Sequence, residues 1–496
     1  MKFALKQIAS AAALVVVSSA AFAVTPTHPV SDYASGTTDI YLAGSSAVDL
    51  ALEKFIANAC VDGSLDSYRS DAAGKTYYLW TCTADATHFN TSNTKIAIHK
   101  NTNSSSDGVN GVVDAASALA FLSTTDLATI TGCTSATVAA TATITAYNQF
   151  ICGTTVGSSG VGTASVVPTF GFADAEPAQF NAAKVGQLVT AYPFSLIQGV
   201  TVTKNLRNAL QTQQGLTSGS ETLADMPSIS SAQVAAIYQG RDTSLANAFG
   251  LSSSTSDNKM YLLRRSGGSG TTRSFDARMV GDVCSSTLAG ITSATTLVTS
   301  TIGTQCKLTA NGGVQKLQAG TSDDLVSCLN SLNADGAYGI GYLTTDYTPV
   351  AGDGYRWLKV DGYEPSLKNV ADGKYKIWSE LSMNYNATTG LTADQTAFYN
   401  VIKAASASQT LMSEVVQNLP QKTDGTNTTW TGGVIGAYPN AKNASGWGLS
   451  VTNTLATANR TDAAMLLNPA NPLTRATTAG YNLCAPAYAV GGYVAK

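Results

Sequence analysis

Charged side chains are scarce in this chain of 496 residues: they make up 12% of it, against about 25% in typical soluble proteins. The formal net charge is only −3, so no broad basic field exists to hold nucleic acid or an anionic membrane. A surface this poor in charge must be covered by serine, threonine, asparagine and glycine. Any binding site for an anion must therefore be local.

Histidine is also rare, with only His28, His88 and His99 in the sequence. No two cysteines have the CxxC spacing of a structural zinc site, and no GxSxG motif marks a nucleophilic serine. These absences argue against a zinc protein and against serine or metal-dependent hydrolases. We therefore predict a protein that is not an enzyme and needs no metal or cofactor.

Long apolar runs are lacking beyond the N-terminus. There, Lys2 and Lys6 precede the apolar run 11–17, and Ala-Phe-Ala follows at 21–23, an order typical of a cleaved secretory signal peptide. No later segment offers the 18 uninterrupted apolar residues of a membrane span. We expect residues 1–23 to be removed and the mature protein to be soluble and exported, to the periplasm or the extracellular space.

Eight cysteines form an even set, which in an exported chain predicts disulfides. Proximity along the chain favours three pairs and leaves a distant fourth by elimination: Cys60–Cys82, Cys133–Cys152, Cys284–Cys306 and Cys328–Cys484.

Three strand-like runs end in small polar residues and then open into helical periodicity. The turns are 44–46 after a strand at 39–42, 104–108 after a strand at 95–99, and RRSGGSGTTRSF at 264–275 after a strand at 261–263. Glycine lets backbone N–H groups converge, hydroxyls add donors, and a helix N-terminus adds a positive dipole end. Arg264 or Arg265 would supply a full positive charge. Each turn is thus a candidate anion site, or alternatively an ordinary loop or helix cap.

The order of these segments resembles the phosphate-binding protein family of high-affinity phosphate importers (PstS-like), which are two-lobed periplasmic binding proteins of type II. The clearest similarity is RRSGGSGTT, where the family has an arginine-rich run leading into D-G-S-G-T. Further similar segments are FGFADAEP at 170–177, AYPFSLIQGVTVTKN at 191–205, ISSAQVAAIYQGR at 229–241 and GTSDDLVSCLNSLNADGAYGIGYLTTDY at 320–347. The resemblance covers residues 39 to about 380. It implies an α/β fold whose two lobes are joined by a doubly crossed hinge.

Carried over residue by residue, the resemblance implies ligand-binding residues in all three turns and in one acidic segment: Ser46, Ala47, Ser105 or Ser106, Asp174, Arg265, Ser269, Gly270 and Thr271. Asp174 matches the family's carboxylate that accepts a hydrogen bond from protonated phosphate. A buried carboxylate would repel sulfate, which carries no proton to share.

One position departs from the family. The family commonly has an acidic residue at the position of Gly267, and that residue pairs with the binding arginine. Without it Arg265 lacks an orienting partner. A different oxyanion or a larger phosphorylated ligand is therefore an alternative.

We expect lobe one to take residues 24–195, lobe two to take 196–345, and residues 346–496 to return to lobe one and form a C-terminal extension. The crossovers are expected near Pro193 and near Tyr342. Three insertions depart from the family, at 60–94, at 123–167 and after about 420. Their cysteines and polar composition predict disulfide-stapled surface loops.

The sequence thus predicts an exported solute-binding protein that captures inorganic phosphate or a related oxyanion and delivers it to an ABC importer complex in the membrane. An alternative is a binding-protein fold that serves as a secreted structural or surface interaction protein without an importer. A phosphatase-type hydrolase is a further alternative, but no motif supports it.

Overall fold

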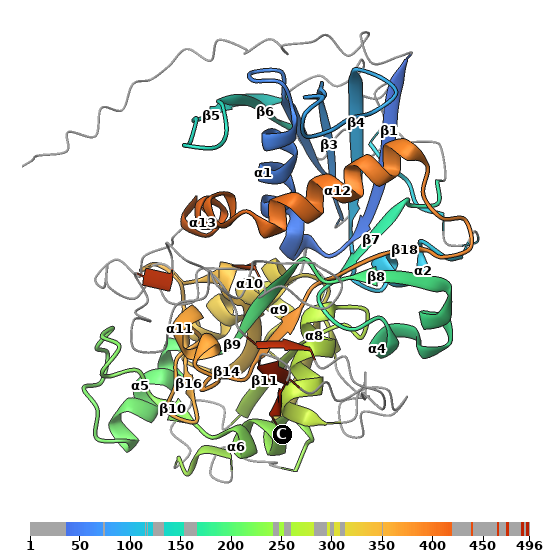
Figure 1. Cartoon of the computed structure of the whole chain (residues 1–496). Coiled ribbons are helices and arrows are strands. Elements are labelled where there is room, and N and C mark those ends of the chain that lie inside the picture. The colour runs from blue at the N-terminus through green and yellow to red at the C-terminus, as the bar shows by residue number, and fades with distance from the viewer. Residues whose placement is uncertain are drawn as a thin grey trace, which may run out of the picture.

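A computed structural model describes residues 36–418 except 73–74, 115, 117, 123–132, 153–165, 242–247, 252–258, 282–294, 298–301, 308–312 and 350, and also 438–439, 464–465, 473–475, 488–490 and 493–495. The predicted signal peptide at 1–23 lies outside the described residues. Two α/β lobes, one above the other in Figure 1, make up the described chain. No helix in these ranges is long and apolar enough to cross a membrane.

A nine-stranded sheet forms the first lobe, in the order β5-β6-β2-β3-β4-β1-β7-β18-β8. Its strands are β1 (Thr37–Gly44), β2 (Asp66–Ala72), β3 (Lys75–Thr83), β4 (Lys95–Thr102), β5 (Thr134–Val138), β6 (Tyr147–Cys152), β7 (Phe170–Ala173), β8 (Leu188–Ala191) and β18 (Ser382–Asn386). The strands β4, β1 and β7 are parallel. Their carboxyl ends therefore meet at one edge of the sheet, and the predicted strands at 39–42 and 95–99 lie within β1 and β4.

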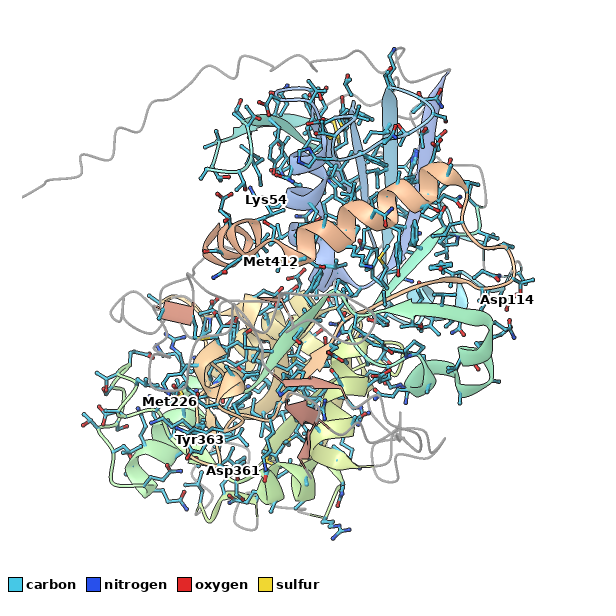
Figure 2. The ribbon with its side chains drawn as sticks, viewed as in Figure 1. Lys54, Asp114, Met226, Asp361, Tyr363 and Met412 are labelled. Carbon is cyan, nitrogen blue, oxygen red and sulfur yellow. A yellow bond between two sulfur atoms is a disulfide. The ribbon has the colours of Figure 1, made fainter. Side chains whose placement is uncertain are left out.

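Three helices cover this sheet: α1 (Asp49–Ala59), α12 (Ala393–Ala407) and α13 (Gln409–Asn418). Leu52, Phe55 and Ile56 of α1 are buried in the first core, as their helical spacing predicts. Met412 of α13 joins the same core (Figure 2). The chain therefore returns to the first lobe after β18, and burial of each such side chain stabilises the lobe by about 1.5–3 kcal/mol.

Two of the predicted insertions are not surface loops but strands of the first sheet. Segment 60–94 supplies β2 and β3, and β3 pairs with β4 along its whole length. Segment 123–167 supplies β5 and β6, and β6 pairs with β2. The aromatic and β-branched content of β3, KTYYLWTCT, is typical of a strand. The predicted disulfides Cys60–Cys82 and Cys133–Cys152 are confirmed.

An eight-stranded sheet forms the second lobe, in the order β12-β13-β11-β14-β9-β15, with β17 and β19 also pairing with β9. Its strands are β9 (Phe194–Thr203), β11 (Lys259–Arg265), β12 (Thr295–Thr296), β13 (Gly313–Ala319), β14 (Tyr338–Thr344), β15 (Tyr355–Trp357), β17 (Trp378–Glu380) and β19 (Tyr438–Pro439). The strands β13, β11 and β14 are parallel, whereas β9 is antiparallel to β14. The first sheet repeats this order with β4, β1, β7 and the antiparallel β18.

The remaining helices and strands are short or flank these sheets. They are α2 (Asp107–Asn110), α4 (Ala178–Asn181), α5 (Lys204–Gln213), α6 (Ser231–Tyr238), α8 (Gly270–Phe275), α9 (Ile302–Gln305), α10 (Ser322–Ala334) and α11 (Leu367–Ala371), with β10 (Ser228–Ile229) paired to β16 (Lys359–Val360), and β20 (Leu473–Arg475), β21 (Tyr488–Val490) and β22 (Tyr493–Ala495) in a small sheet. From the segment after 420, β19 pairs with the start of β9.

From β1 to α13 the chain crosses between the lobes twice, and it enters the second lobe again at β19, which pairs with β9. The first crossing, between β8 and β9, lies where it was expected, at Pro193. The expected second crossing near Tyr342, with a return to lobe one from residue 346, is wrong. Tyr342 is buried inside β14, and β15 and β17 pair with β9 and so stay in the second lobe. The chain returns to the first lobe only between β17 and β18. Until then β15 and β17 supply hydrogen-bonding partners to the edge of β9 opposite β14.

The third described disulfide joins Cys306 to Cys328, which contradicts the predicted pairs Cys284–Cys306 and Cys328–Cys484. Cys306 follows α9 and Cys328 lies on α10. The two helices pack together, so both cysteines are fully buried at their contact. Helix packing, not proximity in sequence, decides this pair. Cys284 and Cys484 lie outside the described residues.

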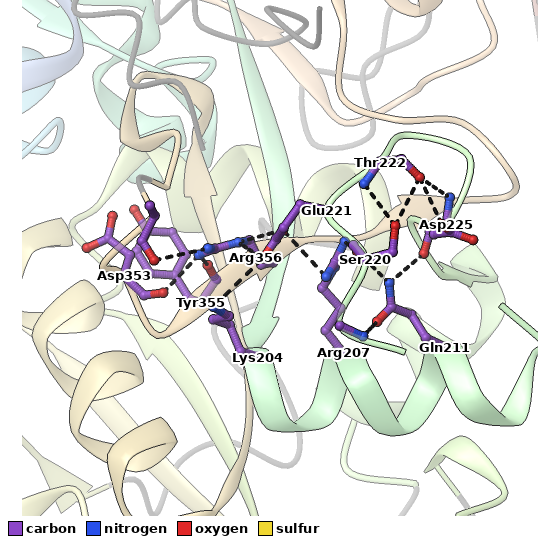
Figure 3. Close-up of polar contacts among 12 residues, drawn as sticks. Lys204, Arg207, Gln211, Ser220, Glu221, Thr222, Asp225, Asp353, Tyr355 and Arg356 are labelled. Carbon is purple, nitrogen blue, oxygen red and sulfur yellow. Dashed lines mark hydrogen bonds and ion pairs between the residues drawn. The ribbon is translucent and has the colours of Figure 1, made fainter. Parts of the chain in front are cut away.

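Three cations surround one carboxylate in the second lobe (Figure 3). Arg356 Nε donates to both oxygens of Glu221 at 3.0 and 2.9 Å, Arg207 Nη1 lies 3.5 Å from Glu221, and Lys204 Nζ lies 3.8 Å from it. The Arg356 guanidinium also donates to the carbonyls of Asp353 and Tyr355. Glu221 therefore fastens its loop to α5 and β15.

We expect Glu221→Gln to destabilise the second lobe by about 3 kcal/mol, because it removes the charge that compensates two buried guanidinium groups. A loss of this size lowers Tm by roughly 6–12 °C for a lobe of this length. Calorimetric unfolding measures it. The control is Asp335→Asn, which weakens only an exposed pair with Lys307 at 3.7 Å. Equal Tm values for the two variants would contradict a structural role for the cluster.

Candidate functional site

A cavity of about 20 Å³ lies between the lobes. It is lined by Ser45, Ser46, Ala47, Asn103, Ser104, Ser105, Asp174, Arg265, Ser269, Gly270, Thr271, Ser322 and Thr344. Only Ala47 and Gly270 lack a polar side chain. The lining residues follow the carboxyl ends of parallel strands in both sheets, which is where open α/β sheets bind ligands. About 10–15 Å³ of such space holds one water molecule, so the cavity is small.

The first turn is shaped by a glycine. Gly44 ends β1 with a φ of +112°, and a Cβ there would lie 2.0 Å from the carbonyl oxygen of Phe172. Ser45 then donates its N–H to that same carbonyl at 2.9 Å, and its hydroxyl accepts from the N–H of Ala47 at 3.1 Å. This tight turn places the predicted residues Ser46 and Ala47 at the cavity.

The second turn separates the two serines that the sequence left as alternatives. Ser105 lines the cavity, and its hydroxyl accepts from the N–H of Asp174 at 3.4 Å. Ser106 is not among the lining residues. Its hydroxyl lies 2.7 Å from that of Ser104, and its N–H donates to Gly268 of the second lobe at 3.1 Å. Ser106 thus joins the lobes, while Ser105 faces the ligand space.

Asp174 follows β7 and is only 4% exposed. Its Oδ2 accepts from the Thr271 hydroxyl at 3.4 Å, whereas Oδ1 is buried with no hydrogen-bond partner of ordinary geometry in the described part of the chain. Burial raises the pKa of Asp174, and the Ser45 hydroxyl, the Arg265 charge and the Thr271 hydroxyl oppose that rise. The cavity therefore contains a carboxylate oxygen that can still accept a hydrogen bond.

The loop after β11 contacts the first lobe directly. Ser269 caps α8 by accepting from the N–H of Thr272 at 3.5 Å. Gly270 and Thr271 form the first turn of α8, where the N–H groups have no acceptor within the helix. A Cβ on Gly270 would lie 2.5 Å from Ser105 Oγ and 2.7 Å from Asp174 Cβ. Only glycine allows this close approach.

The two adjacent arginines point in different directions. Arg265 lines the cavity; its Nη1 donates to Ser322 Oγ at 2.5 Å and its Nε to the carbonyl of Gly320 at 3.2 Å. Arg264 instead forms a buried ion pair with Asp276. The structure thus selects Arg265 as the cation of the cavity and assigns Arg264 to the core of the second lobe.

Gly267 does not leave Arg265 without support, because Ser322 and Gly320 hold its guanidinium. Arg273 donates from Nε to the carbonyl of Gly267 at 2.8 Å, and a Cβ at 267 would lie 3.5 Å from Arg273 Nη2. An acidic side chain at this position would therefore face Arg273.

Sequence reasoning missed five residues of the cavity lining: Ser45, Asn103, Ser104, Ser322 and Thr344. Ser322 and Thr344 lie within segment 320–347, just after β13 and at the end of β14. Their hydroxyls were visible in the sequence, but the order of strands in the sheet is needed to place them beside Arg265. Within the described ranges, no group of three or more histidine, cysteine, aspartate or glutamate side chains is placed to hold a metal ion.

No family model and no curated protein matches this sequence. Among solved structures, a Clostridium perfringens protein with bound phosphate, described as a phosphate ABC transporter substrate-binding protein, is similar at 14% identity over 76% of this chain and 98% of that chain, with a TM-score of 0.41. An ABC-type phosphate transport receptor from Vibrio cholerae shares 13% identity over 54% and 86% of the two chains (TM-score 0.30), and PstS from Borrelia burgdorferi shares 11% over 77% and 97% (TM-score 0.33).

None of these scores reaches 0.5, so the fold assignment depends on this chain's own topology. Each sheet contains three parallel strands followed by an antiparallel strand in the same order, the chain crosses between the sheets twice from β1 to α13, and a polar cavity lies between the carboxyl ends of the parallel strands. The described chain therefore has the two-lobed α/β fold that the sequence analysis expects, extended in the first lobe by disulfide-linked strands.

Proposed function

We propose that this protein is a solute-binding protein that captures inorganic phosphate, or a closely related tetrahedral oxyanion, in the cavity between its lobes. Arg265 supplies a positive charge, and the hydroxyls of Ser105, Ser269 and Ser322 supply neutral donors at the same cavity. Donors from both lobes favour a closed population when the ligand is bound.

The observation that carries the proposal is the buried Asp174 with its unpartnered Oδ1. A carboxylate in an anion site repels any oxyanion that has no proton, so it disfavours sulfate at neutral pH. Hydrogen phosphate can donate its own proton to that oxygen, which turns a repulsion into a charge-assisted hydrogen bond. The same argument admits arsenate.

Thermal unfolding with phosphate, arsenate, sulfate and a phosphate ester tests this function. Ligand at 1,000 times its Kd stabilises the folded state by about 4.1 kcal/mol, which corresponds to a Tm increase of roughly 8–16 °C. We expect this increase with phosphate and arsenate and none with sulfate. An unchanged Tm with all four compounds would refute the proposal.

Export and delivery to an ABC importer belong to the same proposal and are supported by the N-terminal sequence and by the fold. Removal of residues 1–23 predicts a mature N-terminus at Val24. N-terminal sequencing of the protein from the periplasm or the medium checks this. An intact Met1 in the exported protein would contradict it.

A further inference from the structure

Lys100 is a buried cation near the carboxyl end of the strand β4, beside the first turn of the cavity. It is fully buried, with 0% of its surface exposed. Its ammonium donates to the carbonyl of Ser45 at 2.8 Å, to Thr102 Oγ1 at 2.5 Å and to Asp49 Oδ1 at 2.5 Å. An ammonium has three N–H bonds, so these three acceptors use all of them.

Burial opposes the charge on both members of this pair. It lowers the pKa of Lys100 and raises the pKa of Asp49, and in each case the charge of the partner works against the shift. The Thr102 hydroxyl adds a donor to Asp49 at 3.1 Å. A buried ion pair contributes less to the free energy of folding than apolar side chains of similar volume often do. The stability of the fold therefore does not by itself account for the pair.

The bond from Lys100 to Ser45 acts on the first turn of the cavity. The carbonyl of Ser45 and the N–H of Ser46 belong to one peptide group, and in a trans peptide they point in opposite directions. With the carbonyl held by Lys100, the N–H of Ser46 points away from Lys100. No acceptor for this N–H is found in the described part of the chain, and Ser46 lines the cavity. A cation on the carbonyl also polarises the peptide and makes its N–H a stronger donor.

We propose that Lys100 is a positioning residue for anion binding: it fixes and polarises the Ser45–Ser46 peptide so that the Ser46 N–H donates to the ligand. Asp49 holds the ammonium in place. The ligand role of Ser46 rests on the proposed function, whereas the effect of Lys100 on the Ser46 peptide does not. The ammonium also lies close enough to favour the ionised form of Asp174, so one buried charge supports two parts of the site.

The double variant Asp49→Asn/Lys100→Met tests this, because it removes the ammonium without leaving a carboxylate buried and unpaired. We expect its Kd for inorganic phosphate, measured by calorimetry, to rise about 10- to 100-fold, the loss typical of one charge-assisted hydrogen bond. Asp49→Asn alone keeps Lys100 but removes the carboxylate that holds its ammonium, so its Kd should rise by less than that of the double variant. Lys95→Met places the same substitution at the opposite end of β4 and should leave the Kd unchanged.

A second measurement separates this role from general support of the fold. In amide NMR spectra of the ligand-free protein, the Ser46 signal should move upfield in the double variant and stay in place in Lys95→Met, because the peptide is no longer polarised. Phosphate should then shift the Gly270 amide but no longer the Ser46 amide.

Two results would overturn the inference: a double variant that binds phosphate within twofold of the parent, or a Lys95→Met variant that loses as much affinity as the double variant. A parent protein that does not bind phosphate refutes the proposed function instead. The Ser46 signal of the ligand-free variants still decides the effect of Lys100 in that case, since an unmoved signal refutes it and an upfield shift supports it.

Discussion

Asp174→Asn is expected to weaken phosphate binding about 10- to 150-fold at neutral pH and to increase binding of sulfate. The carboxylate accepts the ligand's proton in a charge-assisted bond worth about 1.5–3 kcal/mol, and an amide accepts more weakly. The same substitution removes the negative charge that repels sulfate. The ratio of phosphate affinity to sulfate affinity should therefore fall by a larger factor than the change in either affinity alone.

Asp174→Asn should raise the stability of the ligand-free protein at neutral pH, although it weakens phosphate binding. Burial raises the pKa of Asp174 above its unfolded value, so its favourable contribution to folding is complete only at low pH and is lost as the pH rises through the folded-state pKa. At neutral pH the parent carries the cost of a buried charge, and the amide does not. We expect a higher Tm for the ligand-free variant at pH 7, with a difference that shrinks as the pH falls through the pKa of Asp174.

Titration calorimetry with both anions and unfolding scans across pH measure these two effects. Asp85→Asn is the matched control, because this carboxylate lies on the first lobe, is partly exposed and does not line the cavity. If the Asp174→Asn variant binds phosphate as tightly as the parent and still rejects sulfate, Asp174 does not determine the selectivity.

Gly270→Ala is expected to reduce phosphate affinity more than 100-fold. The new Cβ would lie 2.5 Å from Ser105 Oγ, 2.7 Å from Asp174 Cβ and 2.8 Å from Asp174 N. Two of these atoms belong to the backbone or the Cβ of the other lobe, so a rotamer change cannot relieve the overlap. The lobes would have to separate, and the donors of α8 would move away from those of the first lobe.

Calorimetry gives the affinity of this variant, and small-angle scattering with and without phosphate shows whether the lobes still approach. The control is Gly303→Ala in the same lobe, where a Cβ has nothing within 4 Å. Each lobe of the Gly270→Ala protein should still unfold cooperatively, because the substitution affects only the contact between lobes. Unchanged affinity would mean that the ligand does not require this closed arrangement.

Local patterns predicted the parts of the site that follow a strand directly. The turns that contain Ser46, Ser105 and Arg265 could be named because small polar or charged residues at the end of an apolar run mark the carboxyl end of a strand, whereas Asp174 was expected only from the family resemblance. Ser322 and Thr344 could not be named, because their role depends on β13 and β14 flanking β11, which is a matter of strand order. Lys100 was missed because a lysine in an alternating strand is typical of an exposed position.

The sequence by itself determined the three polar turns and the few charged residues from which a local anion site can be built, because these depend on residue type and short-range periodicity. The two-lobed fold was expected from the family resemblance. Tertiary structure decided which arginine enters the cavity, where the chain returns to the first lobe and which cysteine pairs with Cys306. It also decided that the inserted segments extend a sheet. These outcomes depend on contacts between residues far apart in the chain. Which strands pair and which helices pack together is decided by the whole fold, and no local pattern encodes it.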